Sequence, residues 1–292
     1  MKSVTTMPVP ARVSVVINYC SIESAFIEAM LEQCSVFAHQ IVVSYSDTLH
    51  DGRSDDTTVI DALIQRYRNN NSKHANTNNI KFVKYDVDPS TPALQRRGVV
   101  NRPSAYWHNL ARWTAVTNLD SPDFAKEDWV FVLDADEIPE GGKVLEWLRQ
   151  YELRQDTVYK FNNYWYFKKP TFRATTHEDS ILLVQKKYLN SMDFVFGDDE
   201  RDHIVRKCRE AGCPSVRQVN GLHGLPMFHH FSWVRSPRGM LDKLLTWAHR
   251  DDLFRNVDPV KLVDHVFSDE RVNDVVHGYA YDEVDNLFGL NI

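Results

Sequence analysis

Trp129-Val-Phe-Val-Leu-Asp-Ala-Asp-Glu-Ile-Pro139 is the stretch of sequence that decides the fold. Its first five residues are all apolar, which is typical of a strand buried on both faces of a parallel sheet. The run ends at Asp134, and Asp136 and Glu137 follow at once. Ligands of open α/β sheets bind at the carboxyl ends of the strands. We therefore expect these three carboxylates to line a ligand site.

The segments before this strand repeat the same pattern. β-Branched and apolar runs predict further strands over residues 12–19, 40–45 and 80–87. Apolar residues at helical spacing predict helices over residues 24–34, 55–68 and 106–119. Strands that alternate with helices in this way indicate an α/β fold with a doubly wound, mostly parallel sheet flanked by helices.

The second half of the chain has a different pattern. It predicts antiparallel strands over residues 157–168 and 180–188, and helices over residues 240–250 and 260–267. No linker rich in Gly, Pro or Ser and no internal repeat separates the halves. We therefore expect a single domain over residues 1–292 with two functional halves.

Composition excludes several classes of protein. The chain has 292 residues, of which 43% are hydrophobic and 25% charged, so it is neither disordered nor collagen-like. Its formal charge of -6 argues against a non-specific nucleic-acid binder. No apolar run approaches the ~18 residues that span a bilayer, and no signal-peptide core is present. A soluble, cytoplasmic protein without stable membrane insertion is the expectation.

The cysteine pattern agrees with an intracellular protein. The four cysteines show neither CxxC spacing nor the density of a disulfide scaffold, so we expect reduced thiols. The less favoured alternative is a bond between Cys208 and Cys213 across the turn at Gly212.

The three carboxylates after the fourth strand point to a cation. Crowded carboxylates repel one another unless a cation or protons offset their charge. Mg²⁺ and Mn²⁺ prefer oxygen ligands and also bind phosphate oxygens. The alternative is an acidic turn that caps a helix beginning near Gly141. The very apolar strand before Asp134 favours the metal-site hypothesis.

Several motifs together resemble one family of enzymes. Leu133-Asp-Ala-Asp-Glu-Ile-Pro139 resembles the Asp-x-Asp element of GT-A glycosyltransferases, and residues 13–18 are similar to their first strand. Residues 41–47 with 51–57 resemble the second strand and acidic turn of the family 2 enzymes. Asn109-Leu-Ala-Arg112 stands where these enzymes carry Ala-Arg-Asn-like residues.

Two downstream segments resemble one particular type of glycosyltransferase. Phe228-His-His-Phe-Ser-Trp233 and Lys243-Leu-Leu-Thr-Trp-Ala-His249 are similar to a part of the N-acetylglucosaminyltransferase III type, and Asp-Glu-Ile-Pro fits that type better than family 2. The resemblance spans residues 12–250 and does not identify the sugar transferred.

This resemblance implies a GT-A fold and a metal-dependent glycosyltransferase, either a hexosyl- or a pentosyltransferase. The enzyme would move a sugar from a nucleoside-diphosphate sugar, UDP-linked by preference, to a glycan hydroxyl with inversion. Residues 12–137 would bind the donor, and residues 138–292 would bind the acceptor and complete catalysis. The implied cofactor is Mn²⁺ or Mg²⁺, which would stabilise the charge on the leaving diphosphate.

The resemblance also implies the metal ligands. Asp136 is the expected direct ligand, and Asp134 is expected to contact the ribose or the metal. A later histidine often completes such a site, which makes His229 and His230 candidates. Adjacent residues on an extended segment point to opposite faces, so we expect only one to reach the metal and favour His230. The alternative is a histidine packed among the neighbouring aromatic residues.

Donor recognition is expected from Asp47, Asp55, Asp56 and Arg112. A carboxylate near the second strand can accept a hydrogen bond from a uracil or guanine N–H. The guanidinium of Arg112 can pair with a phosphate. Alternatively, Asp55 and Asp56 are acidic residues that the N-terminus of a helix favours.

Inversion also needs a general base within reach of the acceptor hydroxyl. Two acidic clusters lie downstream of the Asp-x-Asp element, and we rank Asp199 first, Asp198 second and Glu178 third. A solvated acidic turn is the alternative. The aromatic run over residues 162–167 is a candidate platform for the acceptor, although half of it at strand spacing fills core.

Two other functions compete with this hypothesis. A sugar nucleotidyltransferase usually carries a Gly-rich basic loop after its first strand, and Asn18-Tyr-Cys-Ser-Ile-Glu23 lacks one. A non-catalytic carbohydrate-binding protein on the same fold would be favoured by loss of the Asp-x-Asp element, which is intact. Because the chain carries a charge of -6, a diphosphate must be held locally, by a cation and a few basic residues.

Overall fold

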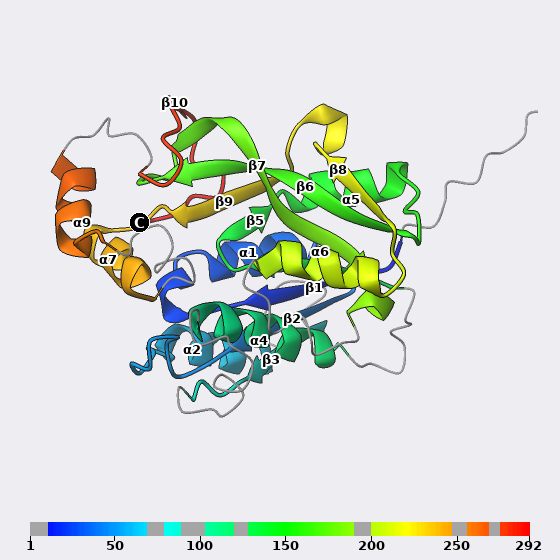
Figure 1. Cartoon of the computed structure of the whole chain (residues 1–292), viewed down its shortest axis with the longest axis horizontal. Helices are drawn as coiled ribbons and strands as arrows, with labels where there is room; N and C mark the ends of the chain where they lie inside the picture. The colour runs from blue at the N-terminus through cyan, green and yellow to red at the C-terminus, as the bar shows by residue number, and fades with distance from the viewer. Residues whose placement is uncertain are drawn as a thin grey trace, which may run out of the picture.

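A computed structural model describes residues 11–68, 79–88, 103–119, 128–189, 200–246, 256–268 and 275–292. One sheet runs through the molecule, with helices on both of its faces (Figure 1). Its order among the described residues is β3-β2-β1-β4-β7-β6-β9-β5, with β10 beside β7 and β8 beside β6.

The first four strands are parallel and form the half of the sheet nearest the N-terminus. They are β1 (Val13–Asn18), β2 (Gln40–Tyr45), β3 (Ile80–Lys84) and β4 (Trp129–Asp134). The helices between them are α1 (Ile27–Cys34), α2 (Thr58–Arg68) and α4 (Pro103–Thr117). The alternation of strands and helices predicted from the sequence is therefore confirmed, and the apolar runs of β1 and β4 are buried on both faces.

The remaining strands curl the sheet with mixed pairing. They are β5 (Glu137–Pro139), β6 (Thr157–Phe167), β7 (Phe172–Gln185), β8 (Ser215–Val219), β9 (Phe228–Trp233) and β10 (Tyr281–Glu283). β7 pairs antiparallel with β4 and β6, whereas β6 pairs parallel with β8 and β9. A mostly parallel half followed by an antiparallel-rich half is the fold class that the sequence predicted.

The other elements cover the sheet. They are α5 (Gly141–Gln150), α6 (Glu200–Glu210), α7 (Pro237–Thr246), α9 (Pro259–Ser268) and the short 3₁₀ turns η1 (Ser21–Glu23), η4 (Lys186–Tyr188) and η6 (Leu222–Gly224). One face of the sheet packs against α1, α2 and α5, and the other against α4 and α6. A third cluster joins α7 and α9 to the ends of β6 and β9 (Figure 1). None of the described helices is both long and apolar enough to cross a bilayer.

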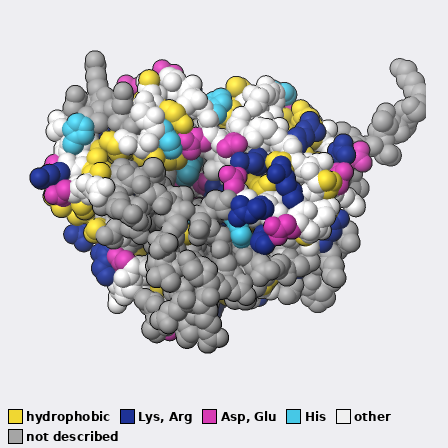
Figure 2. Space-filling model, viewed as in Figure 1, with side chains coloured by type: hydrophobic (Ala, Val, Ile, Leu, Met, Phe, Trp, Pro, Cys, Tyr) yellow, Lys and Arg dark blue, Asp and Glu magenta, His cyan; other side chains and the backbone are white. Residues whose placement is uncertain are grey.

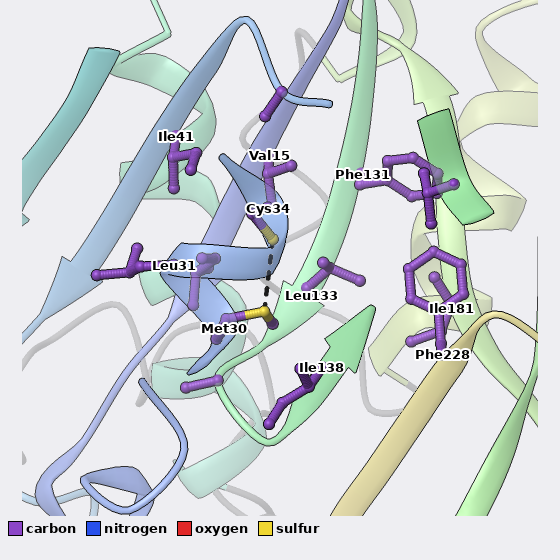
Figure 3. Packing of buried hydrophobic residues seen from close by; sticks show 14 of the residues in the cluster. Val15, Met30, Leu31, Cys34, Ile41, Phe131, Leu133, Ile138, Ile181 and Phe228 are labelled. Carbon is purple, nitrogen blue, oxygen red and sulfur yellow. Dashed lines mark hydrogen bonds between the residues drawn. The ribbon is translucent and has the colours of Figure 1, made fainter. Parts of the chain in front are cut away.

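The core next to α1 is built from side chains of several strands on one face of the sheet. Val15 of β1 points toward Leu31 and Cys34 of α1, while Phe131, Ile181 and Phe228 pack together from three strands (Figure 3). The Cys34 thiol donates to the Met30 sulfur at 3.5 Å. All four cysteines are free, as the spacing predicted.

The strand expected over residues 180–188 is longer and shifted. β7 begins at Phe172 and ends at Gln185, and η4 follows it. Only residues 181–185 form a fully buried stretch, whereas residues 175–177 are exposed. The hydrophobic pattern therefore marked the buried half alone, and pairing with β6 and β10 extends the strand through polar residues.

Candidate active site

Strand register brings the acidic motif and a histidine together. Asn18 of β1 lies opposite Asp134 at the carboxyl ends of two parallel strands. The chain then reverses into β5, where Glu137 lies opposite His230 of β9. The Phe231 N–H donates to the Asp136 carbonyl at 2.8 Å. Residues about a hundred positions apart are thus held beside one another by backbone hydrogen bonds.

Asp134 is surrounded by cationic groups from two helices. Nη2 of Arg112, on α4, donates to both carboxylate oxygens at 3.0 and 2.9 Å. Nη2 of Arg201, on α6, donates to Oδ2 at 2.9 Å. Nε2 of His108 lies 3.3 Å from Oδ1. Burial raises the pKa of Asp134, but the charges of Arg112 and Arg201 outweigh it and hold this pKa well below its ordinary value.

Glu137 is fully buried and anchors the turn. Its Oε1 accepts from Nη1 of Arg201 at 2.6 Å and from Oγ of Ser180 at 2.9 Å. Its Oε2 accepts from the N–H of Asp134 at 2.8 Å. Glu137 therefore fixes the shape of the acidic turn and has no face toward solvent.

Asp136 is the third carboxylate of the turn, and two further cationic side chains contact it. Nη2 of Arg235 and Nζ of Lys243 each lie 3.1 Å from Oδ2. On the other side, Nε2 of His230 lies 3.6 Å from Oδ1. Burial raises the pKa of Asp136, but the charges of Lys243, His230 and Arg235 outweigh this effect and hold the pKa below its ordinary value. The side chain is therefore ionised at neutral pH.

The buried pair of Arg201 and Glu137 yields a stability prediction. Arg201→Met should lower the free energy of unfolding by about 3 kcal/mol, because it leaves a carboxylate buried without its counter-charge. Urea unfolding followed by circular dichroism measures the change. The double variant Glu137→Gln/Arg201→Met should recover part of the loss, since no charge then stays uncompensated.

The matched control for this prediction is Arg154→Met, which breaks an exposed pair with Asp156 and should change stability little. A loss from Arg201→Met no larger than that of the control would contradict the assigned role of the pair.

A cavity of about 290 Å³ opens over the carboxyl ends of β1 and β4. The charged and titratable side chains that line it include Glu23, Asp55, Asp134, Asp136, His230 and Lys243. Figure 2 shows acidic, basic and histidine side chains meeting around a hollow near the centre of one face. Strand ends, helix residues and buried charges therefore converge on one concave site.

The structure separates the residues predicted for the donor. Asp55 lines the cavity, and its Oδ2 accepts from the Ser21 N–H at 3.0 Å. Asp47 does not line it; Asp47 is half exposed and pairs with Lys84 at 2.5 Å. Arg112 is buried behind Asp134 and does not line it either. Asp56 accepts from the Thr58 N–H at the start of α2, which is the alternative reading of that residue.

Glu178 stands between this cavity and a second one. Its Oε1 accepts from the Tyr279 hydroxyl at 3.1 Å and lies 3.3 Å from Nδ1 of His277. The second cavity has a volume of about 630 Å³, and the two share Glu178, Ser180 and Arg201. The two contacts above both involve Oε1 of Glu178, and the carboxylate borders both cavities.

The structure describes only the third-ranked of the three candidate bases, Glu178. Asp198 and Asp199 lie outside the described residues and stay predictions. Of the aromatic run, Trp165 lines the first cavity, Asn162 lines the second, and Tyr166 and Phe167 are buried in core.

The neighbouring histidines point in opposite directions, as expected for a strand. His230 lines the cavity beside Trp165. His229 is buried on the other face, where Nδ1 lies 2.8 Å from the Tyr166 hydroxyl and Nε2 lies 3.1 Å from Glu140. Burial lowers the pKa of His229. Of the two candidates, His230 is therefore the one that can reach a metal in the cavity.

Asp136 and His230 fit a divalent cation. Ligand atoms that bind one ion at about 2.1 Å lie roughly 3 to 3.6 Å apart at coordination angles of about 90 to 120°. The 3.6 Å between Asp136 Oδ1 and His230 Nε2 meets this condition. A carboxylate oxygen suits Mn²⁺ or Mg²⁺, and a neutral imidazole nitrogen is a common ligand of divalent metal ions. Asp134 as a metal ligand stays a prediction, because both of its oxygens face arginines.

Several residues of the site were not expected from the sequence. Arg201 lies on α6, a helix that was not predicted from the sequence. Lys243 was quoted only as part of a similar segment, and Glu23, Arg235 and His277 were given no role. One signal was available: Lys243 interrupts the apolar residues of α7, and a charged residue in such a position needs a buried partner.

Neither a protein-family model nor a curated protein matches the sequence. Among solved structures, a mannosyltransferase from Pyrobaculum calidifontis in complex with GDP-Man and Mn²⁺ is similar, with a TM-score of 0.49 and 12% identity over 88% of this chain and 69% of that chain. Glucosyl-3-phosphoglycerate synthase from Mycobacterium tuberculosis, in complex with Mn²⁺, UDP and phosphoglyceric acid, has a TM-score of 0.42 and 15% identity over 94% and 87%. The glycosyltransferase GlyE from Streptococcus pneumoniae has a TM-score of 0.37 and 15% identity over 88% and 64%.

Proposed function

We propose that this chain is a metal-dependent glycosyltransferase that moves a sugar from a nucleoside-diphosphate sugar to an acceptor hydroxyl, with inversion. One observation carries the proposal: Asp136 and His230 face each other at 3.6 Å in a cavity over the carboxyl ends of β1 and β4. The resemblance of residues 133–139 and 228–233 to GT-A enzymes supports the same conclusion. Ligand binding at strand ends is the rule for open α/β sheets.

Asp136 and His230 would hold the metal, with phosphate oxygens of the donor completing its coordination. When bound, the cation supplies Lewis-acid stabilisation of the negative charge on the departing diphosphate. The described residues gather no cluster of three or more His, Cys, Asp or Glu metal ligands. The donor itself is therefore part of the coordination we propose, and metal and donor should bind together.

Glu178 is the base we propose among the described residues. Its carboxylate takes the proton of the acceptor hydroxyl as that oxygen bonds to the anomeric carbon. The bond from the anomeric carbon to the diphosphate oxygen breaks, and its electron pair leaves with the diphosphate. His277 and Tyr279 position the carboxylate by contacting Oε1, which leaves Oε2 for the acceptor. The second cavity, which shares Glu178 with the first, is where we place the acceptor.

Asp55 is the residue we propose for the nucleobase. It lines the cavity, and burial raises its pKa. A carboxylate accepts equally well from the N–H of uracil or of guanine. We propose a UDP-linked donor first and treat the GDP-linked sugars as the direct comparison.

A panel of UDP- and GDP-sugars, incubated with the full chain and with or without Mn²⁺, tests the proposal. We expect one donor to stabilise the protein against heat by mass action and to release its nucleoside diphosphate, with hydroxyl acceptors accelerating the release. Release of pyrophosphate instead would indicate a nucleotidyltransferase. Binding of sugars without any binding of nucleotides would indicate a carbohydrate-binding protein. Either result would contradict the proposal.

A further inference from the structure

Asp136, the proposed metal ligand, is already contacted by two cationic side chains of the protein. Its Oδ1 lies 3.6 Å from Nε2 of His230, and its Oδ2 accepts from Arg235 and Lys243, each at 3.1 Å. All three side chains of this contact are nearly buried, with exposed fractions of 3% for Asp136, 4% for Arg235 and 7% for Lys243. The seat of the proposed metal is thus already neutralised by the protein's own cations.

Arg235 is held in place from several sides. Its Nε donates to the Ser232 carbonyl at 3.0 Å, and its Nη2 donates to Glu23 at 2.7 Å. Its Nη1 donates to the Ile22 carbonyl, and the guanidinium lies 5.2 Å from the ring centroid of Phe26. Moving Arg235 would break all of these contacts, so it is a fixed part of the site.

Lys243 is held more loosely and faces the cavity. The structure gives its ammonium two carboxylate contacts, Asp136 at 3.1 Å and Glu23 at 3.7 Å. It lines the cavity, whereas Arg235 does not. A lysine ammonium is a compact charge on a flexible four-carbon stem, so it can change partners without moving the backbone. Lys243 is therefore the cation of the two that can leave Asp136.

We propose that Lys243 is an exchangeable counter-cation that couples metal binding to donor binding. In the empty site it neutralises Asp136. When a divalent cation binds Asp136 and His230, the two positive charges repel, and the ammonium transfers its contact from Asp136 to the diphosphate of the donor. This inference rests on the proposed function. Metal and donor then each bind better when the other is present, and Lys243 carries part of that coupling.

The exchange predicts two effects of opposite sign for Lys243→Met. Without nucleotide, the variant should bind Mn²⁺ about tenfold more tightly, because the competing cation is gone. With saturating Mn²⁺, it should bind UDP or GDP about tenfold more weakly, because the diphosphate loses a partner. Both effects lie within the usual range of coupling between sites. A lysine with only a structural role would weaken both ligands or neither.

Two titrations of the full chain measure these effects. The electron paramagnetic resonance signal of free Mn²⁺ gives the metal affinity, and calorimetry gives the affinity for UDP or GDP. Lys207→Met removes a partly exposed lysine of α6 that pairs with Glu210 and serves as the matched control, with no change expected in either affinity. Unchanged or weaker binding of Mn²⁺ to Lys243→Met would overturn the inference.

A second measurement needs no variant and covers the case in which Lys243→Met does not fold. In a crystal structure of the wild type with Mn²⁺ and UDP or GDP, the Lys243 ammonium should lie within hydrogen-bond distance of the diphosphate and away from Asp136. If the ammonium instead stays on Asp136 in that complex, the inference about Lys243 is overturned, while the proposed function still stands. If the wild type binds neither nucleotide in the presence of Mn²⁺, the proposed function fails, and this inference fails with it.

Discussion

Asp136→Asn should reduce kcat/KM for sugar transfer by about 10³-fold and remove the effect of Mn²⁺ on donor binding. The metal contributes several kcal/mol to the stability of the transition state, and each tenfold in rate corresponds to about 1.4 kcal/mol. The amide keeps the size of the carboxylate but gives up its charge, so it is a poor ligand for a hard cation. Release of the nucleoside diphosphate, measured across Mn²⁺ concentrations, checks both effects.

Two further variants make this prediction specific. Asp156→Asn changes an exposed aspartate that pairs with Arg154 and should leave transfer unchanged. His230→Gln removes the other proposed ligand without removing a negative charge from Arg235 and Lys243, so it tests the metal seat should Asp136→Asn lose stability. Wild-type metal dependence in both Asp136→Asn and His230→Gln would exclude the proposed seat.

Glu178→Gln should lower kcat by about 10²- to 10⁴-fold, the usual contribution of a positioned general base. The affinity for the nucleoside diphosphate should change little, because we propose that the free oxygen of Glu178 contacts the acceptor and not the nucleotide. Rapid-mixing measurements of a single turnover, together with calorimetry of the nucleotide, separate the two quantities.

Asp179→Asn is the matched control for this variant. Asp179 follows directly in the sequence, but its side chain is half exposed and pairs with Lys160, so we expect little change in kcat. If Glu178→Gln transfers sugar at the wild-type rate, the base lies elsewhere, and Asp198 and Asp199 become the residues to replace.

Local sequence pattern was sufficient for the strands that are buried along their whole length. The bounds predicted for residues 40–45 match β2, whose four central residues are fully buried. The same logic failed for the first half of β7. Much of that half is polar and partly or fully exposed, so it carries little hydrophobic signal, and it pairs with β6 and β10.

The residues alone placed only Asp134 and Asp136 beside each other, and the resemblance to GT-A enzymes added His230 as a candidate. Asp134 and Asp136 follow one apolar strand, so their place at the strand ends could be derived from the sequence. His230 reaches them through the register of β5 against β9, and Arg201 and Lys243 through the packing of α6 and α7. Such contacts depend on tertiary structure, and no local pattern encodes them.

The structure also refines what the net charge of -6 implies. Arg112 was expected to help hold the diphosphate, and in this structure its guanidinium donates to both carboxylate oxygens of Asp134. Arg201 and Arg235 are likewise bound to buried carboxylates. Because these cations are already offset, a bound divalent cation is what should make the site attractive to a diphosphate.

Calorimetric titration of the wild type with UDP and GDP, in the presence of Mn²⁺ and of excess chelator, tests this account most directly. We predict that Mn²⁺ tightens the binding of one nucleoside diphosphate at least tenfold, within the range of coupling between two sites. Equal affinity with and without the metal would contradict the account.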